Sequence, residues 1–154
     1  MFAKIISGGQ TGVDRAALDV ALECGLPRGG WCPRDRTAED GTIPADYPLT
    51  ETPSADHAQR TEWNVRDSDG TLVLSRGRPT GGTGLTIRLA TFLHKACLVV
   101  QLDEHPETAV VSAWAAKHAV RVLNVAGPRA SQCPAIYAQA AEFLRQVFSD
   151  SAPP

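Results

Sequence analysis

A glycine-rich segment near the N-terminus has the residue types that bind an anion. Ser7-Gly8-Gly9-Gln10-Thr11-Gly12 follows a short β-branched run and precedes an amphipathic stretch, a pattern that predicts strand, loop and helix. Glycines let the backbone approach a ligand closely, and the next helix offers unpaired N–H groups and its positive dipole end. An ordinary capped turn is the alternative. The candidate phosphate-binding residues here are Gly8, Gly9, Gln10, Thr11, Gly12, Asp14 and Arg15.

Two later segments repeat this pattern. A second glycine loop, 80–84, leads into a predicted helix, and a third glycine turn, 127–131, follows the last predicted strand. Ligands of open parallel sheets bind beyond the carboxyl ends of the strands, so the three loops are expected to line one crevice. None has the GKS/T ending of a P-loop or the spacing of a dinucleotide site, which disfavours ATP and NAD enzymes. The second loop adds candidates Gly81, Gly82, Thr83, Gly84 and Thr86.

Polar residues elsewhere could orient a ligand in this crevice. Arg60, Asn64 and Asp67 share one face of a predicted helix, with a solvated face as the alternative. Glu62 and Arg66 are spaced to form an i, i+4 ion pair on that helix. A turn at 39–41 carries two carboxylates that could orient hydroxyl or amine groups or exchange protons, although a solvated turn fits equally well. Asn64 joins the binding candidates, and the orienting candidates are Trp31, Glu39, Asp40, Arg60, Glu62 and Arg76.

Composition excludes several classes of function. The 154 residues carry a formal charge of −2, so no broad attraction to nucleic acid or anionic lipid is expected. The four cysteines form no CxxC and have no histidine at ligand spacing, so we expect no structural metal. Cys24 and Cys97 are predicted to be buried, and Cys32 is the candidate for reactivity. Free thiols, no signal peptide and no apolar run of membrane length indicate a cytoplasmic protein.

The remaining pattern predicts an α/β fold, a three-layer Rossmann-like parallel sheet of about five or more strands with helices on both faces. Residues 1–149 are expected to form one domain, followed by a flexible tail at 150–154. Residues 28–53 have few aliphatics and predict a long functional loop. The expected strands are 4–7, 29–32, 71–75, 96–102 and 121–125. Of these, strand 96–102 is apolar enough to be covered on both faces. The expected helices are 14–24, 57–67, 85–95, 107–118 and 136–148.

Several long segments together resemble the molybdenum cofactor carrier proteins. They are SGGQTGVDRAALD (7–19), GGWCP (29–33), AEDGTIP (38–44), RTEWNVRDSDGT (60–71) and LNVAGPR (123–129). That Rossmann-like family is related to the SLOG and lysine-decarboxylase-like phosphoribohydrolase proteins. The resemblance implies a non-catalytic carrier, a homo-oligomer (dimer or tetramer), that holds and protects the molybdenum cofactor. This ligand is a phosphate-bearing pterin with a dithiolene-bound molybdenum centre, and a molybdenum oxyanion is a simpler candidate.

The phosphoribohydrolase branch supplies the enzymatic alternative. Its motif, Pro-Gly-Gly-x-Gly-Thr-x-x-Glu, aligns with residues 80–88, where Arg88 replaces the catalytic glutamate. A cation cannot replace that carboxylate in catalysis, although Glu62 or Asp14 could supply a carboxylate from elsewhere in the chain. The alternative function is therefore an N-glycosidase acting on a nucleoside monophosphate or a signalling nucleotide. A ligand-gated sensor is a third possibility, weakened by the lack of a fused effector domain.

Overall fold

The computed structural model describes residues 2–150. Its strands are β1 (Lys4–Ile6), β2 (Arg28–Gly29), β3 (Trp31–Cys32), β4 (Thr37–Ala38), β5 (Gly41–Thr42), β6 (Thr50–Glu51), β7 (Gly70–Ser75), β8 (Ala96–Gln101) and β9 (Val122–Ala126). Its α-helices are α1 (Val13–Glu23), α2 (His57–Asp67), α3 (Gly81–Phe92), α4 (Ala109–Lys117) and α5 (Ile136–Ser149). Two 3₁₀ turns, Arg34–Arg36 and Leu102–Glu104, complete the described chain.

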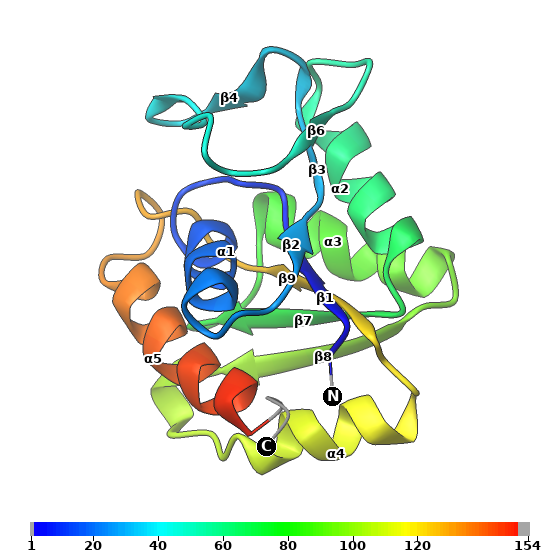
Figure 1. The fold of residues 1–154 in the computed structure, drawn as a ribbon, viewed down its shortest axis with the longest axis vertical. Helices are drawn as coiled ribbons and strands as arrows, with labels where there is room; N and C mark the ends of the chain where they lie inside the picture. The colour runs from blue at the N-terminus through cyan, green and yellow to red at the C-terminus, as the bar shows by residue number, and fades with distance from the viewer. Residues whose placement is uncertain (1, 151–154) are drawn as a thin grey trace.

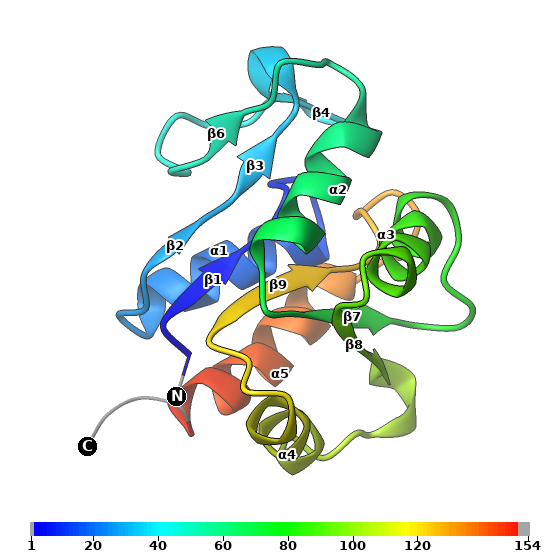
Figure 2. The same ribbon diagram turned by 90° about the vertical axis from the view of Figure 1, so that its right-hand side faces the viewer.

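The main sheet has five parallel strands in the order β2-β1-β9-β7-β8 (Figure 2). The chain moves outward from β1 to β2, crosses to β7 and β8, and returns to insert β9 between β1 and β7. Ile6 pairs with Asn124, and Val73 pairs with Ala126, so β1, β9 and β7 end close together. The strand order reverses at β1, the kind of place where parallel sheets bind ligands.

Helices cover both faces of this sheet, which confirms the predicted three-layer fold (Figure 1). The first face is covered by α1 and α5, whose apolar residues form the main core together with Leu72, Leu74 and Leu123. Val111 and Ala115 of α4 join the same core. The second face carries α2 and α3, where Val65 of α2 and Val73 of β7 are buried. Alternation along β7 sends successive side chains to opposite layers.

The segment between β2 and α2 is more ordered than the predicted structureless loop. It forms a parallel pair, β3 with β6, and an antiparallel pair, β4 with β5, above the main sheet in Figure 1. The Arg36 guanidinium donates to the carbonyl oxygens of Ile43, Pro44, Tyr47 and Leu49 at 2.7–3.3 Å. Two-residue strands have no detectable periodicity, and a cation that satisfies carbonyls leaves no sequence signal either. The predicted strand 29–32 is divided between the two sheets at Gly30.

Predictions about β8, about α3 and about two cysteines were wrong. Strand β8 is not covered on both faces: it is an edge strand, and Val99 is 39% exposed. Helix α3 begins at Gly81, so the predicted glycine loop is largely its first turn. Tertiary position overrides the weak helix propensity of glycine there. Cys24 and Cys97 are only partly buried, whereas Cys32 and Cys133 are buried.

The described residues contain no helix long and apolar enough to cross a membrane. Helix α4 is shorter than predicted and begins at Ala109. The predicted tail, 150–154, lies outside the described residues apart from Asp150.

Candidate functional site

A cavity of about 340 Å³ lies at the carboxyl ends of β1 and β9, beneath α2 and beside the start of α3. Its walls come from all three predicted glycine segments. Its lining residues are Gly8, Gln10, Asp14, His57, Ala58, Arg60, Thr61, Asn64, Gly82, Thr83, Leu85, Thr86, Asn124, Val125, Ala126, Gly127, Arg129 and Gln132. This volume is within the range of small-molecule sites. The predicted convergence of the three segments on one crevice therefore agrees with the geometry.

The N-terminus of α3 opens into this cavity without a side-chain cap. Thr80 occupies the N-cap position, but its side chain accepts no hydrogen bond from the first turn. The first-turn N–H groups of a helix have no intrahelical partner, so those of Gly82 and Thr83 are available. Thr83 is 7% exposed, and its hydroxyl forms no hydrogen bond within residues 2–150. Backbone donors, a free hydroxyl and the helix dipole together favour an anion here.

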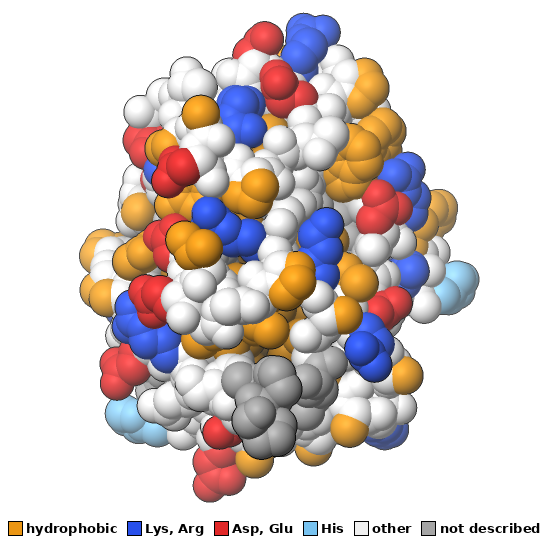
Figure 3. Space-filling view, in the orientation of Figure 1, with side chains coloured by type: hydrophobic (Ala, Val, Ile, Leu, Met, Phe, Trp, Pro, Cys, Tyr) orange, Lys and Arg blue, Asp and Glu red, His pale blue; other side chains and the backbone are white. Residues whose placement is uncertain are grey.

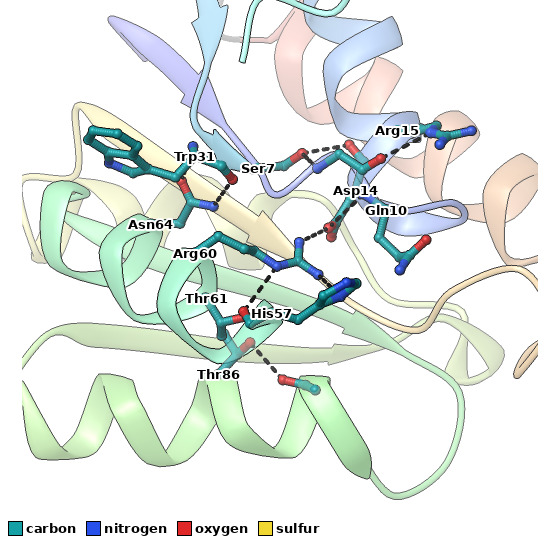
Figure 4. Close-up of polar contacts among 12 residues, drawn as sticks. Ser7, Gln10, Asp14, Arg15, Trp31, His57, Arg60, Thr61, Asn64 and Thr86 are labelled. Carbon is teal, nitrogen blue, oxygen red and sulfur yellow. Dashed lines mark hydrogen bonds and ion pairs between the residues drawn. The ribbon is translucent and has the colours of Figure 1, made fainter. Parts of the chain in front are cut away.

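Asp14 and Arg60 face each other across the cavity wall, as Figure 4 shows. Nη1 of Arg60 donates to Oδ2 of Asp14 at 3.2 Å, and the backbone N–H of Gln10 donates to the same oxygen at 3.3 Å. Burial raises the pKa of Asp14 above its usual value of 3.8, and the attraction of Arg60 offsets only part of this increase. Gly8 is needed beside the pair, because a Cβ there would lie 1.6 Å from Nη1 of Arg60.

The floor of the cavity carries a polar side chain from the central strand β9. Nδ2 of Asn124 donates to Oγ1 of Thr71 at 3.1 Å, while its Oδ1 accepts no hydrogen bond from the described residues. Asn124 is 3% exposed, so its carbonyl oxygen is an acceptor for a ligand N–H group. At the rim, burial and the neighbouring Arg60 lower the pKa of His57. Neutral imidazole is therefore favoured near neutral pH.

Four predicted ligand-binding residues instead brace the loops outside the cavity. Arg15 forms a bidentate ion pair with Asp40 at 2.5 and 2.8 Å, and its Nε donates to the carbonyl oxygen of Gly9. The hydroxyl of Thr11 donates to the Glu39 carboxylate. These contacts hold the first glycine segment in place. They leave the Arg15 guanidinium and the Glu39 carboxylate already occupied.

Glu39 also ties the first glycine segment to the turn after β9. Its carboxylate accepts hydrogen bonds from the N–H and hydroxyl of Ser131 at 3.2 and 2.5 Å, and pairs with Arg129 at 3.4 Å. Desolvation alone would raise the pKa of Glu39, but the hydrogen bonds from Ser131 and Thr11 outweigh it and lower the pKa. Glu39 thus remains ionised and positions two walls of the cavity.

Residues of α2 divide between the cavity and the β3 segment. Asn64 binds the backbone of Trp31 twice, through Oδ1 at 2.8 Å and Nδ2 at 2.9 Å, so its amide is committed to structure although it lines the cavity. The predicted ion pair of Glu62 with Arg66 is absent: Arg66 pairs with Asp67 at 2.8 Å and lies over the Trp63 ring. Trp63 itself is only partly buried.

The predicted binding and orienting residues therefore fall into two groups. Those that line the cavity are Gly8, Gln10, Asp14, Arg60, Asn64, Gly82, Thr83 and Thr86. Those outside its lining are Gly9, Thr11, Gly12, Arg15, Trp31, Glu39, Asp40, Glu62, Arg76, Gly81 and Gly84. Arg88, which aligns with a catalytic glutamate in phosphoribohydrolases, is exposed on α3 and does not line the cavity either.

Sequence reasoning missed several lining residues, notably His57, Thr61, Asn124 and Gln132. Asn124 carried a usable signal, because a buried asparagine in the middle of an apolar strand needs a partner or a ligand. His57 and Thr61 lie one helical turn apart from each other on the first turns of α2, and their spacing with Arg60 and Asn64 could have revealed the shared face.

Charge of both signs covers the face shown in Figure 3, consistent with local rather than global attraction of an anion. Within residues 2–150, no group of three or more His, Cys, Asp or Glu side chains is arranged to hold a metal ion.

The parallel sheet with helices on both faces, and the cavity at its reversal point, define a Rossmann-like α/β protein with a candidate ligand site. Residues 5–148 match the profile of the circularly permutated YpsA SLOG family, and the chain belongs to that family. A crystal structure described as a putative molybdenum carrier protein from Syntrophus aciditrophicus SB is similar, with a TM-score of 0.91 and 46% sequence identity. The match covers 96% of this chain and 94% of that one. No curated protein matches the chain significantly.

Proposed function

We propose that this chain binds the molybdenum cofactor, or a molybdenum oxyanion, in the cavity between α2 and α3 and carries it unchanged. The observation that carries the proposal is the uncapped N-terminus of α3 with the unpartnered Thr83 hydroxyl, opening into a cavity of about 340 Å³. The similarity to a structure named as a molybdenum carrier supports the choice of ligand.

The donors and acceptors suit the two ends of such a ligand. A phosphate or oxyanion requires N–H donors and positive charge, which the first turn of α3 and its helix dipole supply; Arg129, which also pairs with Glu39, lines the same cavity. A pterin edge presents N–H donors and ring acceptors. Oδ1 of Asn124 can accept a hydrogen bond from an N–H group on such an edge. These roles require no step of bond breaking.

Binding of the cofactor to the purified protein under anaerobic conditions tests the proposal. We expect one molybdenum and one pterin per chain, measured by elemental mass spectrometry and by pterin fluorescence after oxidation. Thr83→Val removes the free hydroxyl and should weaken binding about tenfold. Thr91→Val is the matched control, because this threonine lies on the same helix outside the cavity lining. Absence of binding by the cofactor, its pterin and molybdate would contradict the proposal.

One observation favours a second candidate function, hydrolysis of an N-glycosidic bond. The buried Asp14 has a raised pKa, so it could donate a proton to a departing base while water attacks the sugar carbon. Incubation with a panel of nucleoside monophosphates, followed by chromatography for free base, tests this activity. Release of base that is lost in Asp14→Asn would favour the hydrolase over the carrier.

We also propose a cytoplasmic location and a homo-oligomer. The four cysteines are free, which suits a reducing compartment. Phe92 at 75% exposed, Val110 at 50% and Val99 on the edge strand are large apolar side chains in contact with solvent in a single chain. Size-exclusion chromatography with light scattering tests the oligomer, and a monomeric mass would contradict it.

A further inference from the structure

A second, smaller hollow lies at the start of α3 and shares lining residues with the main cavity. It has a volume of about 130 Å³, and Thr83 and Gln132 line both spaces. Ser75, Arg76 and Arg78 from the end of β7, together with Cys133, form its outer wall. Thr83, in the first turn of α3, therefore lines two recesses rather than one.

The small hollow carries positive charge. Arg76 is fixed in place, because its Nε donates to Sγ of Cys133 at 3.0 Å and its Nη2 donates to the carbonyl oxygen of Pro134. Arg78 is exposed and has no hydrogen bond or ion pair with any described residue. No acidic residue lines the hollow. Two guanidinium groups without a carboxylate are typical of an anion site.

Thr83 lines both the main cavity and the positively charged hollow. This residue is more than nine-tenths buried, and its hydroxyl is unpartnered within residues 2–150. An anion held by Thr83 and the first-turn N–H groups would have a neighbouring position for a second anion beside Arg76 and Arg78. The hollow has less than half the volume of the main cavity, which suits a phosphate group rather than a ring system.

We infer that the hollow at Arg76 and Arg78 is a second anion subsite, so that the protein can hold two neighbouring anionic groups. One group would lie at the first turn of α3 and the next in the hollow, with the remainder of the ligand in the main cavity. This inference rests on the proposed function, since the main cavity must hold the ligand, and it adds that the ligand presents a second anionic group beside the first.

Isothermal titration calorimetry with inorganic phosphate and inorganic pyrophosphate tests the subsite. We expect wild-type protein to bind pyrophosphate about tenfold more tightly than phosphate, because a second charge-assisted contact forms. Arg78→Ala should remove this preference. Arg88→Ala is the matched control, since Arg88 is an exposed arginine outside both recesses and should preserve the preference. Thr83→Val should weaken both anions.

Equal affinities for the two anions, a preference that survives Arg78→Ala, or no binding of either anion would overturn the second subsite. Failure of the carrier proposal has a different signature, because it is measured by molybdenum and pterin content. A wild-type protein that binds the cofactor yet shows no pyrophosphate preference would retain the carrier function and lose the subsite. A protein that prefers pyrophosphate through Arg78 but rejects the cofactor would retain the subsite with a different ligand.

Discussion

The ion pair between Asp14 and Arg60 joins α1 to α2 across the carboxyl edge of the sheet, with Nη1 and Oδ2 separated by 3.2 Å. Both side chains are nearly enclosed, at 9% and 11% exposed. The pair therefore connects the helices of opposite layers at the wall of the cavity. Even with a guanidinium beside it, the buried carboxyl keeps a raised pKa, because loss of hydration disfavours its charged form.

This raised pKa predicts an unusual pH dependence of stability for Asp14. Folded Asp14 binds its proton more tightly than unfolded Asp14, so the folded state holds more protons above about pH 3.8. The free energy of unfolding of wild type minus that of Asp14→Asn should therefore fall as pH rises from 3.8 to the raised pKa. Urea unfolding at a series of pH values measures this difference.

Glu23→Gln supplies a control of opposite sign. The hydrogen bond from Arg145 lowers the pKa of Glu23 below 4.5, so its contribution is present above that value and lost as pH falls through the lowered pKa. The free energy of unfolding of wild type minus that of Glu23→Gln should therefore rise with pH. A flat or rising difference for Asp14→Asn would show that its carboxyl is not destabilised by burial.

A substitution at Gly82 should separate stability from binding. Its added Cβ would have no atom within 4 Å, and alanine is the better helix former, so Gly82→Ala should stabilise the fold by up to about 1 kcal/mol. The methyl group would project where Gly82 lines the cavity, and we expect weaker binding of phosphate. Thermal unfolding and calorimetry measure the two effects.

Gly84→Ala is the matched control for this prediction. Gly84 belongs to the same helix but does not line the cavity, and the nearest atom to its added Cβ is the flexible Nη1 of Arg88 at 3.3 Å. Similar stabilisation with unchanged phosphate affinity is expected. Equal loss of affinity in both variants would mean that the helix, rather than its open surface at Gly82, controls binding.

The three-layer arrangement and the convergence of the glycine segments were predictable from the sequence, because the periodicity of apolar residues and the positions of glycines are local signals. The sheet residues 71–75 and the helix 57–67 were placed within one residue of β7 and α2. The function of individual side chains was less predictable. Arg15 and Arg60 are both cations near the first glycine segment, yet Arg15 is paired with Asp40 outside the cavity while Arg60 lies in its wall.

That difference depends on residues distant in sequence. Asp40 lies 25 positions after Arg15, and Arg60 lies 46 positions after Asp14, so neither pairing follows a helical or strand period. Gly8 illustrates the same limit. Its lack of a side chain was interpreted as room for a ligand, whereas the atom closest to its Cβ position belongs to Arg60. Local patterns identify the elements, and three-dimensional packing assigns the partners.

Loss of the Glu39 carboxylate should loosen the turn after β9. Glu39→Gln removes the charge that pairs with Arg129 and weakens the hydrogen bonds from Thr11 and Ser131. Hydrogen exchange followed by mass spectrometry should show faster exchange in residues 128–132 with little change in global stability. Glu51→Gln is the control, since that carboxylate accepts from the Asp35 N–H at 2.6 Å elsewhere in the segment. Unchanged exchange at 128–132 would exclude the bracing role.

Asp19 should control the ionisation of both tyrosines of the chain. The hydroxyls of Tyr47 and Tyr137 donate to its two carboxylate oxygens at 2.8 and 2.5 Å. Burial, together with this hydrogen bond, raises the pKa of Tyr137 to about 12 and raises that of Tyr47 further. Asp19→Asn should lower both pKa values, whereas Asp103→Asn, an exposed substitution on the 3₁₀ turn after β8, should leave them unchanged.

Ultraviolet absorbance titration detects this change directly, because the chain contains two tyrosines and both contact Asp19. The folded state holds its phenolic protons more tightly than the unfolded chain, so wild-type stability should fall as pH rises from 10 towards the raised pKa values. The decline should be smaller in Asp19→Asn. Since Tyr47 lies in the segment above the sheet and Asp19 on α1, a titration curve identical to wild type would show that this contact does not hold the segment to the helix.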